Sequence, residues 1–278
     1  MAHSLTFAVI GGDRRSFYAA KRLEEYGFET KLFGIEKEET YNPLKKIQAD
    51  AVLLPVPFTR DGIHIFAPES TEEFLISDVL ASVSANSLIF AGNVNDITNK
   101  RILDYGKRET FAIRNAVSTA EGALLLALQN GKRTVFGMRV AVIGYGKVAF
   151  ATAKLFHAVG AVVTVFARKE QARIEAHMMG YTAKSLDELS ACAGEYELLI
   201  NTVPARILNR EILSKISKDA WIMELASAPF GLDFDEAKIL GVHVELASGL
   251  PGKFFPETAG YAVADTGLDF LREKEILF

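Results

Sequence analysis

The segment Arg139–Ala149, Arg-Val-Ala-Val-Ile-Gly-Tyr-Gly-Lys-Val-Ala, decides the fold of this chain. Residues 140–143 form an apolar run typical of a buried strand, and a helical pattern follows the turn. In the pattern G-x-G-x-x-A, Gly144 permits the tight turn, Gly146 lets the backbone approach a pyrophosphate, and Ala149 lets helix and strand pack closely. Because the turn joins a strand to a helix and a further strand follows, it predicts a dinucleotide-binding Rossmann domain.

Apolar β-branched runs alternate with helical patterns along nearly the whole chain, which predicts an α/β fold of two doubly wound parallel-sheet domains. In the first half we expect strands near 5–10, 29–34, 51–56, 87–91 and 110–113. Helices there are expected near 14–26, 71–83 and 95–107. In the second half we expect strands near 139–143, 162–166, 197–203, 220–226 and 242–247. Helices there are expected near 148–159, 169–179, 209–216 and 233–240, with a last helix near 258–272.

A nearly apolar helical stretch, Ser118–Gln129, stands between the two halves. Ser118 is a good N-cap with Glu121 three residues later, and Asn130-Gly131 should end the helix. A helix that is apolar on most faces is buried on most faces, so we expect it to join the two domains as a buried helix. The predicted domains are a flavodoxin-like substrate domain over 1–129, the Rossmann domain over 130–256, and a C-terminal helix, 257–278, that packs back on the first domain.

Composition and charge argue against several classes of protein. The 278 residues are 49% apolar, enough for sizeable cores, and the net charge of −4 comes without a long Lys/Arg stripe, which argues against a nucleic-acid partner. No apolar run approaches the roughly 20 residues that span a membrane, and no secretory signal is recognisable, so we expect no membrane partner. Cys192 is the single cysteine, which excludes an intramolecular disulfide. We expect a cytoplasmic protein.

The residues at the end of the strand that follows the glycine turn and its helix indicate whether the domain binds NAD or NADP. A carboxylate there would hydrogen-bond the 2′-hydroxyl of the adenosine ribose. This chain has the sequence Val-Phe-Ala-Arg-Lys over 165–169 instead, with no carboxylate before Glu170. Arg168 could pair with a 2′-phosphate, helped by Lys169, or it could be a solvated arginine at the start of a helix. We predict NADP.

Two later loops are expected on the same edge of the sheet, where ligands bind in open α/β folds. The third strand of this half ends in Asn-Thr-Val-Pro over 201–204, and the fourth runs into the loop 224–229. Either loop could also be ordinary turn chemistry. The predicted nucleotide-binding residues are Gly144, Tyr145, Gly146, Lys147, Val148, Arg168, Lys169, Asn201, Thr202, Val203, Pro204 and Ala226.

The substrate-binding residues are predicted mainly from positively charged side chains that lack an obvious partner. Arg14 and Arg15 stand in the first turn of a helix, where the helix dipole favours carboxylates, so an anion should compensate them. We expect one of them to face a carboxylate ligand and the other to face Asp13 or solvent; a purely structural ion pair is the alternative. Lys253, at the end of the Gly-containing segment Ala247–Lys253, adds a further positive charge. The predicted substrate-binding residues are Arg14, Arg15, Asn93, Ser118, Ser227, Lys253 and Thr258.

We assign no catalytic residue. The five histidines are His3, His64, His157, His177 and His243, and none follows a predicted strand end, where a general base would meet the nicotinamide. None has Cys, Asp or Glu at metal-ligand spacing, so we expect no bound metal.

The two-domain layout with a C-terminal Rossmann domain resembles the formate/glycerate dehydrogenase-like group. Its 2-hydroxyacid members use an Arg-Glu-His set with the His late in the chain, and this chain has no His after His243. A closer resemblance, over nearly the whole chain, is to the family of the dipicolinate synthase A subunit. It is carried by the segments Val9–Arg15, Thr119–Ala123, Val142–Val148, Leu225–Gly231 and Leu250–Lys253. Phe230 departs from the family pattern, which has Gly there.

The resemblance implies an activity and a setting. The family oxidises dihydrodipicolinate or hydroxytetrahydrodipicolinate to dipicolinate with NADP, for endospore formation in the mother-cell cytoplasm. It implies a small dicarboxylate substrate, an oligomer, and a flavoprotein-like partner, the dipicolinate synthase B subunit. Two alternatives remain open from the residues alone: another NAD(P)-dependent amino- or oxo-acid dehydrogenase, and a nucleotide-binding regulatory subunit.

Overall fold

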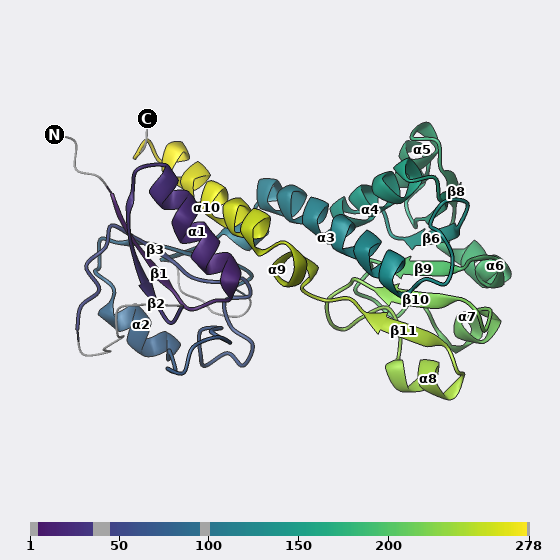
Figure 1. Cartoon of the computed structure of the whole chain (residues 1–278), viewed down its shortest axis with the longest axis horizontal. Helices are drawn as coiled ribbons and strands as arrows, with labels where there is room; N and C mark the ends of the chain where they lie inside the picture. The colour runs from purple at the N-terminus through teal and green to yellow at the C-terminus, as the bar shows by residue number, and fades with distance from the viewer. Residues whose placement is uncertain (1–4, 36–44, 95–100, 277–278) are drawn as a thin grey trace. The chain divides into compact units, whose positions relative to one another are not determined.

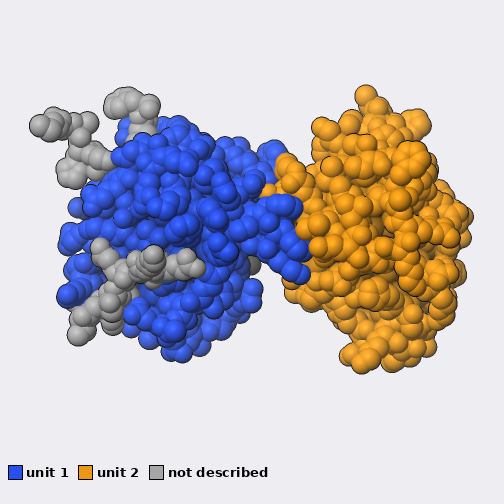
Figure 2. Space-filling view, in the orientation of Figure 1, with its two compact units in different colours: residues 1–115, 251–278 blue, residues 116–250 orange. Residues whose placement is uncertain are grey.

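The computed structural model describes residues 5–35, 45–94 and 101–276 (Figure 1). The chain forms two compact units, and Figure 2 colours them separately. Unit 1 comprises residues 1–115 and 251–278, and unit 2 comprises residues 116–250. These boundaries differ from the predicted 129/130 and 256/257. Each observed boundary lies inside a helix rather than between two elements: the first within α3 (Glu109–Asn130) and the second within α9 (Leu250–Phe254).

The sheet of unit 1 has five parallel strands in the order β2-β1-β3-β4-β5. The strands are β1 (Thr6–Ile10), β2 (Glu29–Phe33), β3 (Ala51–Leu53), β4 (Leu88–Ala91) and β5 (Ile102–Asp104). This is the flavodoxin-like order, with its topological switch point between β1 and β3. The helices of unit 1 are α1 (Arg14–Glu25), α2 (Ile76–Ser82), α10 (Pro256–Glu273) and the short 3₁₀ turn η1 (Tyr105–Lys107).

Helix α10, from the end of the chain, packs beside α1, from its beginning (Figure 1). Gly260 permits the close approach, because a Cβ there would clash with the carbonyl oxygen of Arg15. Arg22 of α1 donates from Nε to Asp265 at 3.2 Å, and the Tyr261 hydroxyl donates to Glu25 at 3.0 Å. The C-terminal helix therefore completes the core of unit 1.

The sheet of unit 2 has six parallel strands in the order β11-β10-β9-β6-β7-β8. This is the Rossmann strand order, with the switch point between β6 and β9. The strands are β6 (Arg139–Ile143), β7 (Val162–Phe166), β8 (Thr182–Lys184), β9 (Leu198–Asn201), β10 (Trp221–Glu224) and β11 (His243–Leu246). The helices are α4 (Lys147–Ala158), α5 (Glu170–Met178), α6 (Leu189–Cys192), α7 (Arg210–Lys215) and α8 (Phe234–Ile239), with 3₁₀ turns η2 (Leu186–Glu188) and η3 (Ala193–Glu195). The predicted α/β class with two doubly wound parallel sheets is confirmed.

Several predicted elements of unit 1 are wrong. Residues 110–113, predicted as a strand, lie in the first turns of α3, because a short apolar run is compatible with a strand or with a buried helix. The fifth strand is β5 instead, inside the predicted helix 95–107, of which 95–100 lies outside the described residues. The predicted helix 71–83 shortens to α2. Ser118 is not an N-cap, because α3 begins nine residues earlier at Glu109.

Helix α3 also corrects the expectation that no apolar segment has the length of a membrane span. Its 22 residues satisfy that test by length and composition alone. Half of its most apolar window is buried inside the protein, and core helices of soluble proteins satisfy the same test.

Candidate functional site

The turn after β6 brings backbone into close contact with the loop after β9. Gly144 has a φ of +103°, in the left-handed region that favours glycine. A Cβ there would clash with Thr202 Oγ1 and would lie 2.9 Å from Val203 Cγ2. The Gly144 N–H donates to the carbonyl of Phe166 at 2.8 Å, which ties the turn to the end of β7. Only glycine satisfies both the conformation and the contact.

The start of α4 is open. Gly146 is its N-cap, and no side chain caps the helix amides there. A Cβ at Gly146 would meet nothing within 4 Å, so there is space in front of the first turn, which Lys147 and Val148 begin. The N-terminal amides of a helix and the positive end of its dipole, beside open space, fit a pyrophosphate.

Tyr145 contributes main chain rather than side chain to this turn. Its ring packs edge-on against Phe150, with centroids 6.0 Å apart, and its hydroxyl is buried without a hydrogen-bond partner among the described residues. Burial raises the pKa of Tyr145, and the nearby Tyr181 and Glu175 act in the same direction. The buried phenol therefore points into its own unit rather than to solvent.

Cations collect at the end of β7. Arg168 and Lys169 are exposed, and within the described part of the chain the Arg168 guanidinium has no hydrogen bond or ion pair. Arg173, which was not predicted from the sequence, lies in α5 and donates from Nη1 to the carbonyls of Ala167 (3.0 Å) and Arg168 (2.8 Å). Its spacing of five residues from Arg168, near the start of the same helix, is the signal that could have revealed it. Arg173 holds the backbone from which the two exposed cations project.

A buried polar pair lies at the ends of β9 and β10. Asn201 and Glu224 are both fully buried. Asn201 Nδ2 donates to Glu224 Oε1 at 2.7 Å and to the carbonyl of Val203 at 3.0 Å, and its Oδ1 accepts from the Val203 N–H. Burial raises the pKa of Glu224, opposed by hydrogen bonds from Asn201 and from the amides of Gly231 and Ala226. Glu224 was not predicted, although a lone acid in the apolar strand Trp-Ile-Met-Glu is an unusual buried charge.

The loop after β10 contains Phe230, which stands where the family pattern has Gly. Its φ of +63° is in the left-handed region, which explains why Gly suits this position. The Phe230 ring packs edge-on against Phe234, with centroids 5.3 Å apart, and this contact offsets part of the strain. In the same loop Ala226 is buried and Ser227 exposed, while Pro204 in the neighbouring loop is exposed.

In unit 1 the two arginines at the start of α1 behave differently. Arg15 forms a bidentate pair with Asp13, from Nε and Nη2 at 2.8 Å each, and also donates to the carbonyl of Val56 at 2.6 Å. Although burial opposes it, the hydrogen bonds and charge of Arg15 hold the pKa of Asp13 below its usual value. Arg14 is exposed, with no side-chain partner among the described residues. Arg15 is thus the arginine that faces Asp13, which leaves Arg14 as the uncommitted cation.

The other predicted substrate residues are spread over several elements. Gly252 lies against Arg15, because a Cβ there would be 2.8 Å from its Nε, and the neighbouring Lys253 is exposed over the ring of Phe254 at 5.0 Å. Asn93 is exposed in a left-handed conformation (φ +58°), and its N–H donates to Asp104 at 3.0 Å. Thr258 is exposed on α10. Ser118 is 2% exposed inside α3, so it does not present its hydroxyl to a ligand in this structure.

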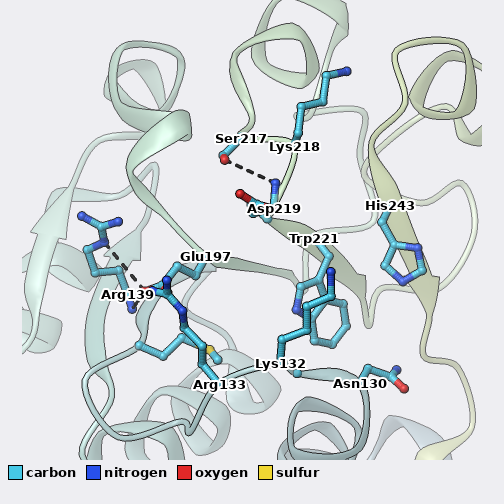
Figure 3. A pocket seen from close by; sticks show the side chains of 13 residues that line it. Asn130, Lys132, Arg133, Arg139, Glu197, Ser217, Lys218, Asp219, Trp221 and His243 are labelled. Carbon is cyan, nitrogen blue, oxygen red and sulfur yellow. Dashed lines mark hydrogen bonds and ion pairs between the residues drawn. The ribbon is translucent and has the colours of Figure 1, made fainter.

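A cavity of about 640 Å³ in unit 2 lies at the other edge of the sheet, at the amino ends of β6, β9, β10 and β11 (Figure 3). Arg133 and Arg139 both turn to Glu197 there, the first through an ion pair of 3.2 Å and the second through one of 3.9 Å. Lys218 donates to the carbonyl of Leu240 at 2.9 Å. Because ligands of open parallel sheets bind at the carboxyl ends of the strands, this cavity is not part of the nucleotide site.

The fold and the open glycine turn define the class: an oxidoreductase with a nicotinamide-cofactor domain of the dehydrogenase type. Residues 109–231 match the family described as D-isomer specific 2-hydroxyacid dehydrogenase, NAD binding domain, and residues 6–109 match the N-terminal domain of the dipicolinate synthase A subunit. The chain is 32% identical to the A subunit of dipicolinate synthase from Bacillus subtilis (strain 168) over 98% of both chains. It belongs to the family of the dipicolinate synthase A subunit.

Comparison with solved structures supports the same family. The A chain of dipicolinate synthase from Bacillus subtilis matches with a TM-score of 0.85 at 32% identity, over 99% of this chain and 98% of that one. The A subunit from Bacillus halodurans matches with a TM-score of 0.84 at 27% identity, over 96% and 97%. A Salmonella D-lactate dehydrogenase shares the fold, with a TM-score of 0.62 at 14% identity over 97% of both chains.

Proposed function

We propose that this protein oxidises dihydrodipicolinate, or its hydrated form hydroxytetrahydrodipicolinate, to dipicolinate with NADP as electron acceptor. The observation that carries the proposal is its 32% identity, over 98% of the chain, to a relative named as the A subunit of dipicolinate synthase. From the same similarity we propose that it acts in the mother-cell cytoplasm during endospore formation.

The preference for NADP rests on the end of β7. Arg168 and Lys169 are exposed where an NAD-specific domain places a carboxylate, and Arg173 fixes the backbone beneath them. An extra phosphate on the adenosine ribose would pair with the Arg168 guanidinium. Titration of the protein with NADPH and NADH tests this directly: NADPH should bind at least about 10-fold more tightly. Equal affinities would contradict the assignment.

The reaction removes one hydride and one proton from the dihydro ring, and the hydrated substrate must also lose water. Bound NADP supplies the hydride acceptor. Because the ring becomes aromatic, the residues of this chain mainly have to position the substrate. Arg14 and Lys253 are exposed cations suited to its two carboxylates, and we propose that solvent takes the proton.

The activity test uses purified protein with NADP and freshly prepared substrate, with and without the flavoprotein-like B subunit that we propose as its partner. Dipicolinate and NADPH should appear in equal amounts. A background rate of NADPH formation under both conditions would contradict the proposal. Light scattering of the same preparation tests the oligomer that we also propose.

A nucleotide-binding regulatory subunit is the second candidate, favoured by the pairing of Arg15 with Asp13, which removes one cation from the substrate side. Hydride transfer by the isolated chain separates the two candidates, because a regulatory subunit would bind nucleotide without forming NADPH. A screen of amino and oxo acids, followed by NADPH absorbance, tests for a related dehydrogenase with another substrate.

A further inference from the structure

Glu224 is a fully buried carboxyl group that the proposed reaction leaves without a role. Its Oε1 accepts from Asn201 Nδ2 at 2.7 Å and from the Ala226 N–H at 2.9 Å, and its Oε2 accepts from the Gly231 N–H at 3.1 Å. All of these partners are donors. A carboxylate, which only accepts, is the form that satisfies them.

These contacts connect the two loops that follow β9 and β10. Asn201 holds the first loop through both the N–H and the carbonyl of Val203. Glu224 holds the second loop at its beginning and its end, through Ala226 and Gly231. Gly231 allows the packing, because a Cβ there would clash with Asn201 Nδ2. One buried carboxylate therefore sets the conformation of both loops.

The position of these loops within the Rossmann unit determines what they face. A dinucleotide lies across the switch point with one nucleotide over each half of the sheet. Arg168 places the adenosine half over β7, so the nicotinamide half belongs over β9 and β10. The loop after β9 also touches the glycine turn, through Thr202 and Val203 against Gly144.

We propose that Glu224 is a positioning residue that shapes the nicotinamide half of the cofactor site by fixing the 201–204 and 226–231 loops through Asn201, Ala226 and Gly231. The inference rests on the proposed function of unit 2 as an NADP-binding unit. It assigns a role in cofactor geometry to a residue whose side chain is fully buried among protein donors.

The test compares two ligands on the full chain. NADPH occupies both halves of the site, whereas adenosine 2′,5′-bisphosphate occupies the adenosine half only. Glu224→Gln replaces one carboxylate oxygen with an NH₂ group, which is a donor. That NH₂ group faces another donor, either the Gly231 N–H or Asn201 Nδ2, so the loops should shift. We expect the Kd of NADPH to rise about 10-fold and the Kd of the bisphosphate to change less than about 2-fold. Glu211→Gln, an exposed glutamate of α7 paired with Lys215, is the matched control and should change neither constant.

A second variant reaches the same network from the other side. Gly231→Ala keeps the Glu224 carboxyl group but pushes a methyl group into Asn201 and to 3.1 Å from Glu224 Oε2. It should produce the same selective loss of NADPH affinity, and the double variant with Glu224→Gln should lose less than the product of the two single effects, because both disturb one network. A folded variant is recognised by its cooperative thermal transition, so either variant can carry the test if the other does not fold.

The outcomes separate the two ideas. Equal weakening of NADPH and bisphosphate, or no weakening of either in a folded variant, overturns the positioning role of Glu224. Failure of the unmodified protein to bind either nucleotide overturns the proposed function, and the inference with it. Binding of both ligands by the unmodified protein, with loss confined to NADPH in the variants, supports both.

Discussion

In each unit the first strand of the sheet is followed by a glycine turn and a helix of 12 residues, yet the two turns treat the start of the helix in opposite ways. In unit 1 Asp13 caps α1 by accepting from the Arg15 N–H at 3.1 Å, and it also binds the Arg15 guanidinium. In unit 2 Gly146 caps α4 without any side-chain bond. The first helix thus carries its own anion, whereas the second leaves the same position open.

The difference shows that the parallel α/β unit alone does not make a nucleotide site. Both turns contain glycine with positive φ, Gly11 (+65°) and Gly12 (+99°) in unit 1 and Gly144 (+103°) in unit 2, so a left-handed glycine after the first strand does not by itself make a nucleotide site. The residue at the N-cap separates the two turns. A carboxylate there satisfies the helix amides internally, and a glycine leaves them to a ligand.

The largest effect is expected where the open turn meets its neighbouring loop. Gly144→Val adds a side chain that would clash with Thr202, so the turn must move away from the phosphate position. We expect NADPH affinity to fall at least about 100-fold, because the amides that hold the diphosphate lose their alignment. Calorimetric titration with NADPH measures the effect.

Gly137→Val is the matched control for that variant. Gly137 also has positive φ, +77°, but a Cβ there meets nothing within 4 Å. It therefore carries the backbone strain without the clash and should lose stability while NADPH binding is retained. Equal loss of NADPH binding in the two variants would show that strain, rather than the contact with Thr202, is responsible.

Gly146→Asp converts the turn of unit 2 into the kind found in unit 1. The space in front of Gly146 admits the side chain, and its carboxylate would cap α4 as Asp13 caps α1. We expect NADPH affinity to fall about 30-fold, since the carboxylate takes the helix amides and repels the diphosphate, while the thermal midpoint stays the same or rises slightly. The same calorimetric titration, with a thermal melt of each protein, measures both quantities.

Gly146→Asn separates the two causes, because asparagine caps the helix equally well but carries no charge. Its loss of affinity should be clearly smaller than that of Gly146→Asp. If the aspartate variant bound NADPH as tightly as the unmodified protein, the comparison between the two units would have no functional meaning.

The strands that the sequence predicts well are those whose pattern is visible locally. The glycine pattern and the long β-branched runs predict β6 and β7 at their observed bounds. Strands β5 and β8 have three residues each and lie in no longer apolar run, and both were missed. Strand β3 is equally short, but it lies in the apolar run 51–56 and was predicted. The run 110–113 was placed in a strand because its tertiary environment, a long helix, is not visible locally.

The site residues divide in the same way, into those whose role is visible in the local sequence and those whose role depends on distant residues. Arg168 and the glycine turn were predicted because their chemistry is local to one strand end. Glu224 was missed because its function depends on Asn201, 23 residues away, and on Gly231, 7 residues away. The pairing of Arg15 with Asp13 was foreseen as one of two possibilities, since spacing alone does not say which arginine turns to the carboxylate.

A smaller effect is expected at Arg168, the cation that we propose distinguishes NADPH from NADH. Arg168→Ala should weaken NADPH binding about 10-fold and leave NADH binding unchanged, because only the former carries the 2′-phosphate. Fluorescence titration with both nucleotides measures the ratio. Lys154→Ala, which removes an exposed cation from α4, controls for the general loss of positive charge. An equal loss for NADPH and NADH in Arg168→Ala would mean that Arg168 does not read the extra phosphate.

The smallest effect is expected in the closed turn. Asp13→Asn keeps an oxygen at the N-cap but removes the charge that faces Arg15, so the free energy of unfolding at pH 7 should fall by roughly 1 kcal/mol. Because the pKa of Asp13 is lowered in the folded protein, its contribution is present above the ordinary aspartate pKa and is lost as the pH falls through the folded value. Urea unfolding of both proteins should therefore show a difference at pH 7 that shrinks in acid, below pH of about 4. A difference that stays constant down to a pH of about 3 would show that the carboxylate does not act through its charge, and that the closed turn owes its stability to hydrogen bonding alone.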